Sequence, residues 1–168
     1  SEGGATLLET IKTSKLRAID IGKPLPLQEP YDSDTLDLSS TGMDPGHVLL
    51  LSWWLTTEFS AAVTSINCLH NPLGEGLQVI TKVFEDTPRL RTLCGLEEGI
   101  ETIDWSNSDK GPVEVALLAV DLKAGRAAAA VARLILDCNP LTGGRYDSDS
   151  DKDITGVVKL CDTLKTSS

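Results

Sequence analysis

The most constraining feature of the sequence is an internal repeat, in which a short pattern of apolar and polar residues occurs four times. Each copy reads apolar-x-apolar-x-x-(Asn/Thr/Ser)-x-apolar, except that Lys110 occupies the last position of the third copy. A period of roughly 20 to 50 residues is typical of chains whose structural units stack on one another. The copies are "LDLSSTGM", "INCLHNPL", "IDWSNSDK" and "LILDCNPL", and they begin 30, 37 and 31 residues apart, at Leu36, Ile66, Ile103 and Leu134.

Each copy predicts a strand, a turn and then a helix. The first two apolar residues stand two positions apart, which places both side chains on one face of a short strand. Asn71 and Asn139 follow where the chain turns away, and a buried Asn there can satisfy backbone groups of the bending strand. Thr41 and Ser108 are shorter substitutes. A stretch with one apolar helical face follows each turn, and such a unit buries that face only by stacking on its neighbours.

The repeated block resembles the leucine-rich repeat of the ribonuclease-inhibitor-like kind, in which the pattern L-x-L-x-x-N-x-L precedes a helix. The match is carried by residues 34–62, 63–89 and 131–141, and best by "INCLHNPLGEGLQVI". The resemblance implies an α/β fold, a leucine-rich-repeat solenoid that forms a short horseshoe arc. A parallel β-sheet would line its concave face, and helices would cover its convex face.

We expect a single leucine-rich-repeat domain over residues 1–168, with about five irregular repeats. The segment "LRTLCGLEEG" at 90–99 looks like a shortened extra turn, and "LRAIDIGKPL", which starts at Leu16, parallels it. Stacked repeats need polar caps, and neither terminus shows an obvious one, which leaves a truncated chain, a longer parent or a capping partner as alternatives. The approximate units are 1–33, 34–62, 63–89, 90–130 and 131–168.

Composition and charge argue against several classes of protein. With 40% hydrophobic and 24% charged residues, the chain has an ordinary globular balance. Its net charge of −10 would repel a phosphate backbone, so no nucleic acid is expected as a partner. The strongest apolar run, "HVLLLSWWL" at 47–55, is far shorter than the roughly 18 to 20 residues that span a bilayer, so no membrane insertion is expected.

The cysteines indicate the compartment. They lie far apart, form no C-x-x-C pair, and each stands in an apolar periodic segment. Free, buried thiols are expected, which indicates a reducing environment and an intracellular, cytoplasmic protein, with an organelle as the alternative. The four are Cys68, Cys94, Cys138 and Cys161.

No group of residues predicts an enzyme, a cofactor or a metal site. The stretch "GEGLQV" begins like a dinucleotide fingerprint, but Val79 stands where the third glycine belongs. Cys68-x-His70 offers two kinds of metal ligand, yet His47 lies in another repeat and Cys68 takes a core position. Neither histidine stands beside a nucleophile elbow. We therefore expect a protein that is not an enzyme, has no catalytic or metal-binding residues and needs no cofactor.

Residues on the open face of the strands are the main candidates for binding a partner. They stand between the paired apolar residues, and three of them are aspartates, so like charges would lie at strand spacing. A basic protein surface could relieve that repulsion, and a merely solvated face is the alternative. By resemblance, leucine-rich repeats are typically protein-binding scaffolds that use the concave sheet. The candidates are Asp20, Asp37, Asn67, Asp104 and Ile135, flanked by Leu69, Ser106 and Asp137.

Trp53 and Trp54 are further candidates for partner binding. Adjacent helical residues point about 100° apart, so both indoles cannot be fully buried on one narrow face. An exposed tryptophan is enriched at interface hot spots, and the edge of the core is the alternative location.

The acidic stretch "GGRYDSDSDKDITG", residues 143–156, sets four aspartates at alternate positions. Calcium collects six to eight oxygens, but an EF-hand loop from Asp147 would have Lys152 in place of its glycine and Val158 in place of its glutamate. The stretch is then an insert where one repeat was opened, and a secondary candidate for contact with a basic neighbour. The aspartates are Asp147, Asp149, Asp151 and Asp153.

These observations together predict a non-catalytic protein–protein interaction or assembly module. It would bind a protein with a basic surface through the concave acidic face or through its open repeat ends, where a neighbouring subunit could cap it. The alternatives are a purely structural subunit of a large complex and a calcium-responsive module that uses the loop 147–153.

Overall fold

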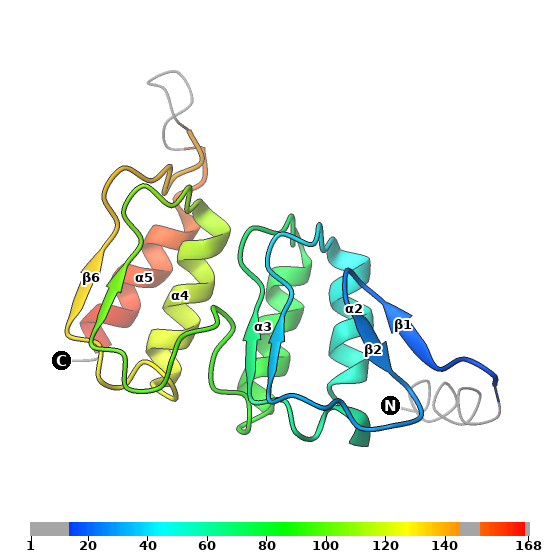
Figure 1. The fold of residues 1–168 in the computed structure, drawn as a ribbon. Coiled ribbons are helices and arrows are strands. Elements are labelled where there is room, and N and C mark those ends of the chain that lie inside the picture. Colours follow the sequence, from blue (N-terminus) through cyan, green and yellow to red (C-terminus); the bar gives the residue numbers. More distant parts are fainter. Residues whose placement is uncertain (1–13, 145–151, 167–168) are drawn as a thin grey trace.

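The computed structural model describes residues 14–144 and 152–166, which form a mixed α/β fold (Figure 1). The strand β3 (Thr35–Asp37) pairs in parallel with β4 (Ser65–Asn67), and β5 (Thr102–Asp104) pairs in parallel with β6 (Arg133–Ile135). An antiparallel hairpin of β1 (Ala18–Asp20) and β2 (Pro24–Pro26) precedes them. The helices are α2 (Pro45–Trp54), α3 (Gly76–Asp86), α4 (Pro112–Ala124) and α5 (Thr155–Thr166), with a short 3-10 helix at Glu58–Ser60.

The strand, turn and helix of each repeat follow the order that the sequence predicts. In the register, Leu36 lies opposite Ile66, and Ile103 lies opposite Leu134, so the repeat starts are aligned. Leu36, Ile66 and Ile103 are buried. None of the helices in the described ranges is long and apolar enough to cross a bilayer.

All four repeats share an unusual backbone turn. The residue before the Asn, Thr or Ser position has a positive φ, in a region that non-glycine residues seldom occupy. A left-handed residue costs roughly 1 to 2 kcal/mol, so its recurrence at one position means that the surrounding contacts impose it. These residues are Ser40, His70, Asn107 and Cys138, with φ values of 56°, 57°, 51° and 58°.

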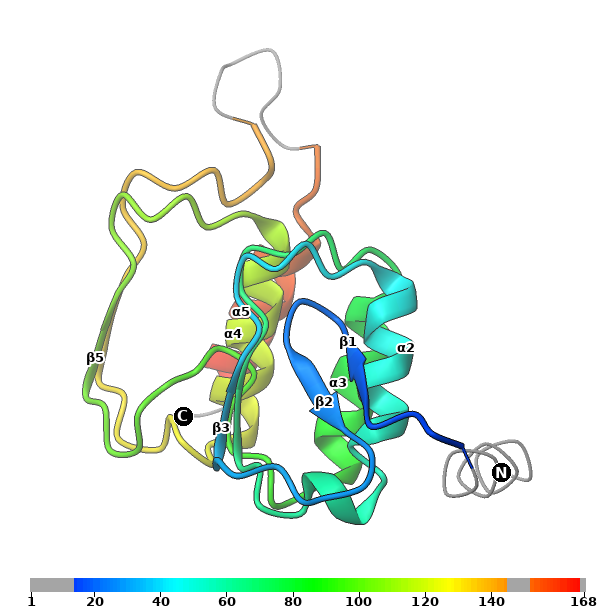
Figure 2. The same cartoon turned by 45° about the vertical axis from the view of Figure 1, so that its right-hand side comes forward.

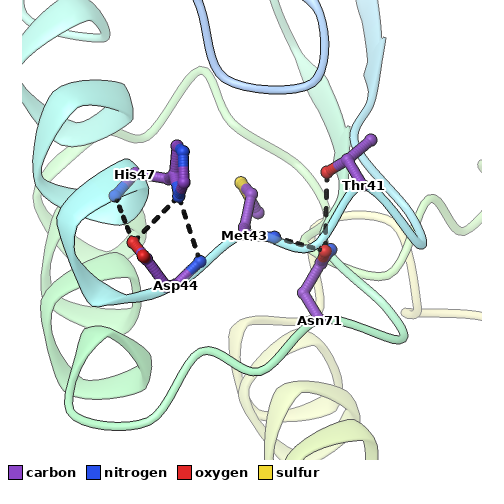
Figure 3. Close-up of polar contacts among 5 residues, drawn as sticks. All are labelled: Thr41, Met43, Asp44, His47 and Asn71. Atoms are coloured by element: carbon purple, nitrogen blue, oxygen red, sulfur yellow. Dashed lines mark hydrogen bonds and ion pairs between the residues drawn. The ribbon is translucent and has the colours of Figure 1, made fainter.

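The buried side chain of Asn71 holds one of these turns in place. Its Nδ2 donates to the carbonyls of Leu38 (2.8 Å) and Cys68 (3.1 Å), and thus joins two successive repeats. Its Oδ1 accepts from the backbone N–H of Met43 (2.9 Å) and lies near the hydroxyl of Thr41, as Figure 3 shows. The polar residue at the turn therefore satisfies backbone groups, as its position in the sequence predicts.

Asn139 makes the matching set of contacts in the second half of the chain. Its Nδ2 donates to the carbonyls of Trp105 (2.6 Å) and Leu136 (2.9 Å). Its Oδ1 accepts from the backbone N–H groups of Ser108 (3.2 Å) and Lys110 (2.8 Å). The same contacts therefore join each parallel pair of repeats.

Helix starts and ends are also satisfied by side chains. The Asp44 carboxylate accepts from the backbone N–H of His47 (2.9 Å) and caps the start of α2 (Figure 3). Two arginines that follow helices reach back and donate to carbonyls near the helix ends of the preceding unit, and these carbonyls also accept local hydrogen bonds. Arg89 donates to Leu55 (2.9 Å), and Arg126 donates to Phe84 (2.9 Å).

The strands do not form the single parallel sheet that the resemblance implies. The described residues form three two-stranded sheets, and Figures 1 and 2 both show the pair β5–β6 set apart from the pair β3–β4. The shortened segment 90–99 lies between these pairs. Its residues Thr92 and Cys94 bridge to β4, but no helix follows them before α4. The expected shortened turn is confirmed, and it divides the sheet.

The first unit also differs from the expected stack. β1 pairs with β2, so Asp20 does not share a strand register with Asp37. The reason is a tight turn in which Asp20 Oδ1 accepts from the backbone N–H of Gly22 (2.8 Å), whose φ is 98°. A Cβ on Gly22 would lie 2.4 Å from Cβ of Thr41, so the turn packs closely against the next unit and requires glycine.

The role of the turn asparagines can be tested by removing them. Asn71→Ala leaves buried carbonyl and N–H groups without partners, so it should lower the free energy of unfolding by about 3 kcal/mol. Asn139→Ala should cost less, about 1 to 2 kcal/mol, because Asn139 is only half-buried and water can replace it. Urea unfolding of both variants measures the difference. If both variants lost the same free energy of unfolding, the contribution of these asparagines would not depend on how deeply they are buried.

Candidate functional site

The candidate residues on the open face of the strands are the last residues of the three-residue strands, because middle residues such as Leu36 and Ile66 are buried in the core. Asp37 lies beside its register partner Asn67. Among the last residues of β3, β4, β5 and β6 only Asp37 and Asp104 are charged, and they belong to different sheets. Asp104 lies opposite Ile135, which is half-buried. The acidic column expected from the sequence is therefore divided into two short segments, and Asp20 lies outside both.

The side chains of Asp37, Asn67 and Asp104 are each held by a local turn, in which a side-chain oxygen accepts from the backbone N–H two residues later. Asp37 Oδ1 accepts from the backbone N–H (3.0 Å) and hydroxyl (2.7 Å) of Ser39. Asp104 Oδ1 accepts from the corresponding groups of Ser106, at 2.9 Å and 2.7 Å. Asn67 Oδ1 accepts from the N–H of Leu69 (3.1 Å). The carboxylates are thus oriented before any partner arrives.

Hydrogen bonding also keeps these two aspartates charged. The serine hydroxyl is the largest cause that lowers the pKa of Asp37, and the same is true of Ser106 and the pKa of Asp104. The positive charges of Lys23 and Arg133 lower the two pKa values further. Intrachain cations therefore already relieve part of the repulsion that the sequence led us to assign to a basic partner.

Two of the expected partner-binding residues are not accessible. Trp54 is 0% exposed, its Nε1 donates to the carbonyl of Pro26 (2.8 Å), and its ring meets Tyr31 edge-on. Leu69 is 6% exposed. Both residues belong to the core, so neither is a candidate for binding a partner. Trp53 is half-buried, so the two indoles do differ in burial, as adjacent helical positions predict.

The remaining expected residues lie at or near the surface. Ser106 is half-buried and Asp137 is exposed. Asp147, Asp149 and Asp151 of the acidic insert lie outside the described residues. Asp153 is exposed, and its carboxylate accepts from the backbone N–H of Thr155 (3.0 Å) at the start of α5.

The cysteines are all free thiols, but only two match the expected burial. Cys68 and Cys94 are buried, and Cys138 and Cys161 are exposed. Burial raises the pKa of Cys68 to about 12 and raises that of Cys94 well above its usual value. Because the thiolate is the nucleophilic form, these two groups are poor nucleophiles. Cys138 occupies the left-handed turn position, and the residues at this position in all four repeats are exposed.

Sequence reasoning missed a polar cluster where the two halves of the chain meet. Lys110 is 6% exposed, and its Nζ lies 2.7 Å from Nε2 of His70 and 5.1 Å from the ring centre of Trp105. The Glu114 carboxylate accepts from the backbone N–H groups of His70 (3.1 Å) and Gly111 (2.8 Å). The available signal was Lys110 itself, which stands where every other copy has an apolar residue.

A second buried contact of α4 was also missed. Asp121 stands seven residues after Glu114, on the same face of the helix, and is fully buried. Its carboxylate accepts from the Thr92 hydroxyl (2.5 Å) and from the backbone N–H groups of Leu93 (2.8 Å) and Cys94 (3.1 Å). Burial is the largest influence on its pKa and raises it. Hydrogen bonds oppose that shift, and together these contacts attach the shortened segment to α4.

The chemistry available to these groups is that of a structural joint. In residues 14–144 and 152–166, no three or more His, Cys, Asp or Glu side chains are placed to hold a metal ion. Lys110 has a lowered pKa, chiefly because burial disfavours its charge. Its amine contacts the His70 imidazole in the first half of the chain and the Trp105 ring in the second half, and so joins the two halves. Comparisons with protein-family models, curated proteins and solved structures gave no match.

The cost of burying Lys110 can be measured. Lys110→Met restores the apolar residue of the other repeats and removes a buried charge, so it should raise the free energy of unfolding by about 1 kcal/mol at pH 7. Folding lowers the pKa of Lys110 from 10.5, so the buried amine loses its proton at a lower pH than the amine of the unfolded chain. The free-energy cost of burying the charge therefore falls as pH rises toward 10.5. Urea unfolding should therefore show that the extra free energy of unfolding of Lys110→Met, relative to the native chain, becomes smaller between pH 7 and 10. A destabilised Lys110→Met would show that the His70 contact outweighs the burial cost.

Proposed function

We propose that this chain is a non-catalytic protein–protein interaction or assembly module, built from repeats of the leucine-rich kind as a short, interrupted arc. The observation that carries the proposal is the recurring turn that holds Asp37 and Asp104, each with a serine hydroxyl and N–H on the same oxygen. Two ionised side chains held in fixed orientation lose little entropy when they meet a partner, which favours binding.

The proposed partner is a protein with a basic surface. Asp37 and Asp104 are exposed, and their pKa values lie below the usual range, so both carry full charge at neutral pH. With a net charge of −10 the chain attracts cationic surfaces, and such attraction weakens with salt. We also propose an intracellular location, because all four cysteines are free thiols.

Charge removal that leaves the turns intact tests the proposal. In Asp37→Asn/Asp104→Asn the amide oxygen can still accept the turn hydrogen bonds, as Asn67 does, but both charges are lost. Salt-sensitive capture of a basic partner from extract should fall about fivefold to tenfold. The matched control Asp20→Asn/Asp32→Asn removes two exposed charges elsewhere and should leave capture unchanged. Equal capture by both double variants would sink the proposal.

A second candidate is a purely structural subunit, and one observation favours it. Three large apolar side chains are about half exposed at the last described helix, α5: Val158 (47%) and Leu164 (52%) within the helix, and Ile154 (52%) directly before it. A neighbouring subunit that packed on this helix would bury them and cap the stack.

If the chain is a structural subunit, we expect it to form an assembly that depends on α5. Size-exclusion chromatography with light scattering should show a species larger than the monomer, and Val158→Glu/Leu164→Glu should return it to monomer mass. The control Leu49→Glu/Leu50→Glu changes an exposed apolar pair on α2 and should leave the mass unchanged. A wild-type monomer at every concentration would argue against self-assembly through this end.

A further inference from the structure

A groove of about 480 Å³ lies in the helical layer, away from the strand face. Its floor is formed by the C-terminal half of α4, with Ala119, Val120 and Ala124. Phe84 of α3 lines one wall, and Thr163 and Lys159 of α5 line the other. Figure 1 shows the three helices in the order α3, α4, α5, so the groove follows the middle helix between its two neighbours.

The groove follows from the shortened segment. Residues 90–99 occupy a strand position beside β4 but bring no helix, so the helical layer lacks one member between α3 and α4. Asp121 binds α4 to that segment, and α4 packs mainly on α5 and only lightly on α3. The buried Ala119 and the half-buried Val120 and Ala124 line this part of α4, and these side chains do not fill the space left between the two outer helices.

The charges around the groove differ in sign from the chain as a whole. Lys123 and Lys159 line it, are exposed, and have no ion pair in the described part of the chain. Asp162 also lines it, but its carboxylate is paired with Lys165 at 3.2 Å. Glu85 is the other lining acid. The unpaired lysines stand out in a chain with 15 basic and 25 acidic residues.

Arg126 closes the groove at the end of α3. Its guanidinium lies 4.5 Å from the centre of the Phe84 ring and donates to the carbonyls of Phe84 (2.9 Å) and Leu90 (2.8 Å). Because its hydrogen bonds are taken up by the backbone, this arginine is a rigid wall and not a free ligand-binding group. The two lysines are the groups that can meet an anionic ligand.

We propose that this groove binds an amphipathic helix of a partner protein that carries acidic residues beside its apolar stripe. The lining stretches 119–126 and 159–166 each extend about 10 Å, which matches apolar residues at i, i+4 and i+7 of a docked helix. The small floor residues allow a close approach, and the lysines would meet the acidic flanks. This surface is separate from the strand face, so the inference does not depend on the function proposed above.

The form of the groove favours a helix over a small amphipathic molecule. Small ligands bury most of their surface in their sites. Here the rim residues Lys123, Lys159 and Asp162 are all exposed, so an occupant keeps one side in water. A helix with one apolar face meets that condition, because its polar face stays hydrated.

The test uses a designed helical peptide of about 18 residues, with leucines at i, i+4 and i+7 and glutamates beside them. Fluorescence anisotropy with the full chain should give binding about tenfold tighter than for the same peptide with lysines in place of glutamates. Lys123→Glu/Lys159→Glu should reverse that preference. Ala124→Trp should reduce binding of the acidic peptide about tenfold by filling the groove. The control Lys15→Glu/Lys82→Glu makes the same charge change at exposed sites outside the groove and should leave binding unchanged.

Three results would overturn the proposal. One is no binding of the acidic peptide at about 1 mM. Another is an equal loss of binding in the groove variants and in the Lys15→Glu/Lys82→Glu control. The third is saturable binding of decanoate that Ala124→Trp abolishes while the peptide does not bind, which would assign the groove to a small amphipathic acid.

Discussion

The fold depends on satisfying backbone N–H and C=O groups at places where short strands end. Each strand has only three residues, so a large share of its backbone groups lies next to a turn. Asn71 and Asn139 supply donors and acceptors on both sides of such turns, and they join the second copy of the repeat to the first and the fourth copy to the third. Without them, buried polar groups would face an apolar core, which costs more than most single contacts return.

The same requirement explains the irregular middle of the chain. The segment 90–99 pairs with β4 on one side, and on its other side the next strand does not pair with it. The buried carboxylate of Asp121 takes over that role and accepts from two of its N–H groups. A side chain from a helix can do so only if the helix comes close. The position of α4, the division of the sheet and the groove beside α3 therefore share one cause.

The period of the sequence predicted the order of strand, turn and helix, and even the shortened turn, because apolar spacing and turn residues are local signals. The polar cluster around Lys110 and the buried contact of Asp121 were not predictable in the same way. Glu114 and Asp121 look like ordinary acidic residues of a helix, and their burial depends on two segments more than twenty residues earlier in the chain, one at His70 and one at 92–94. The pairing of Asp20 was also missed, because "LRAID" and "LRTLC" are alike in sequence while the Gly22 turn sends only the first into a hairpin. Trp54 was a partner-binding candidate together with Trp53, because the sequence did not show which indole is buried or that Trp54 donates to the carbonyl of Pro26.

The distribution of charge separates the strand face from the helical layer. Asp37 and Asp104 carry fixed negative charge on the strand face, whereas Lys123 and Lys159 leave positive charge beside the groove. Sheet and helices of one unit lie on opposite sides of the shared core, so an occupant of one surface does not block the other. Ligands of opposite charge could then be held at the same time. The rigid core between the surfaces fixes their separation, and binding at two places by one assembly would gain from effective concentration without any new contact.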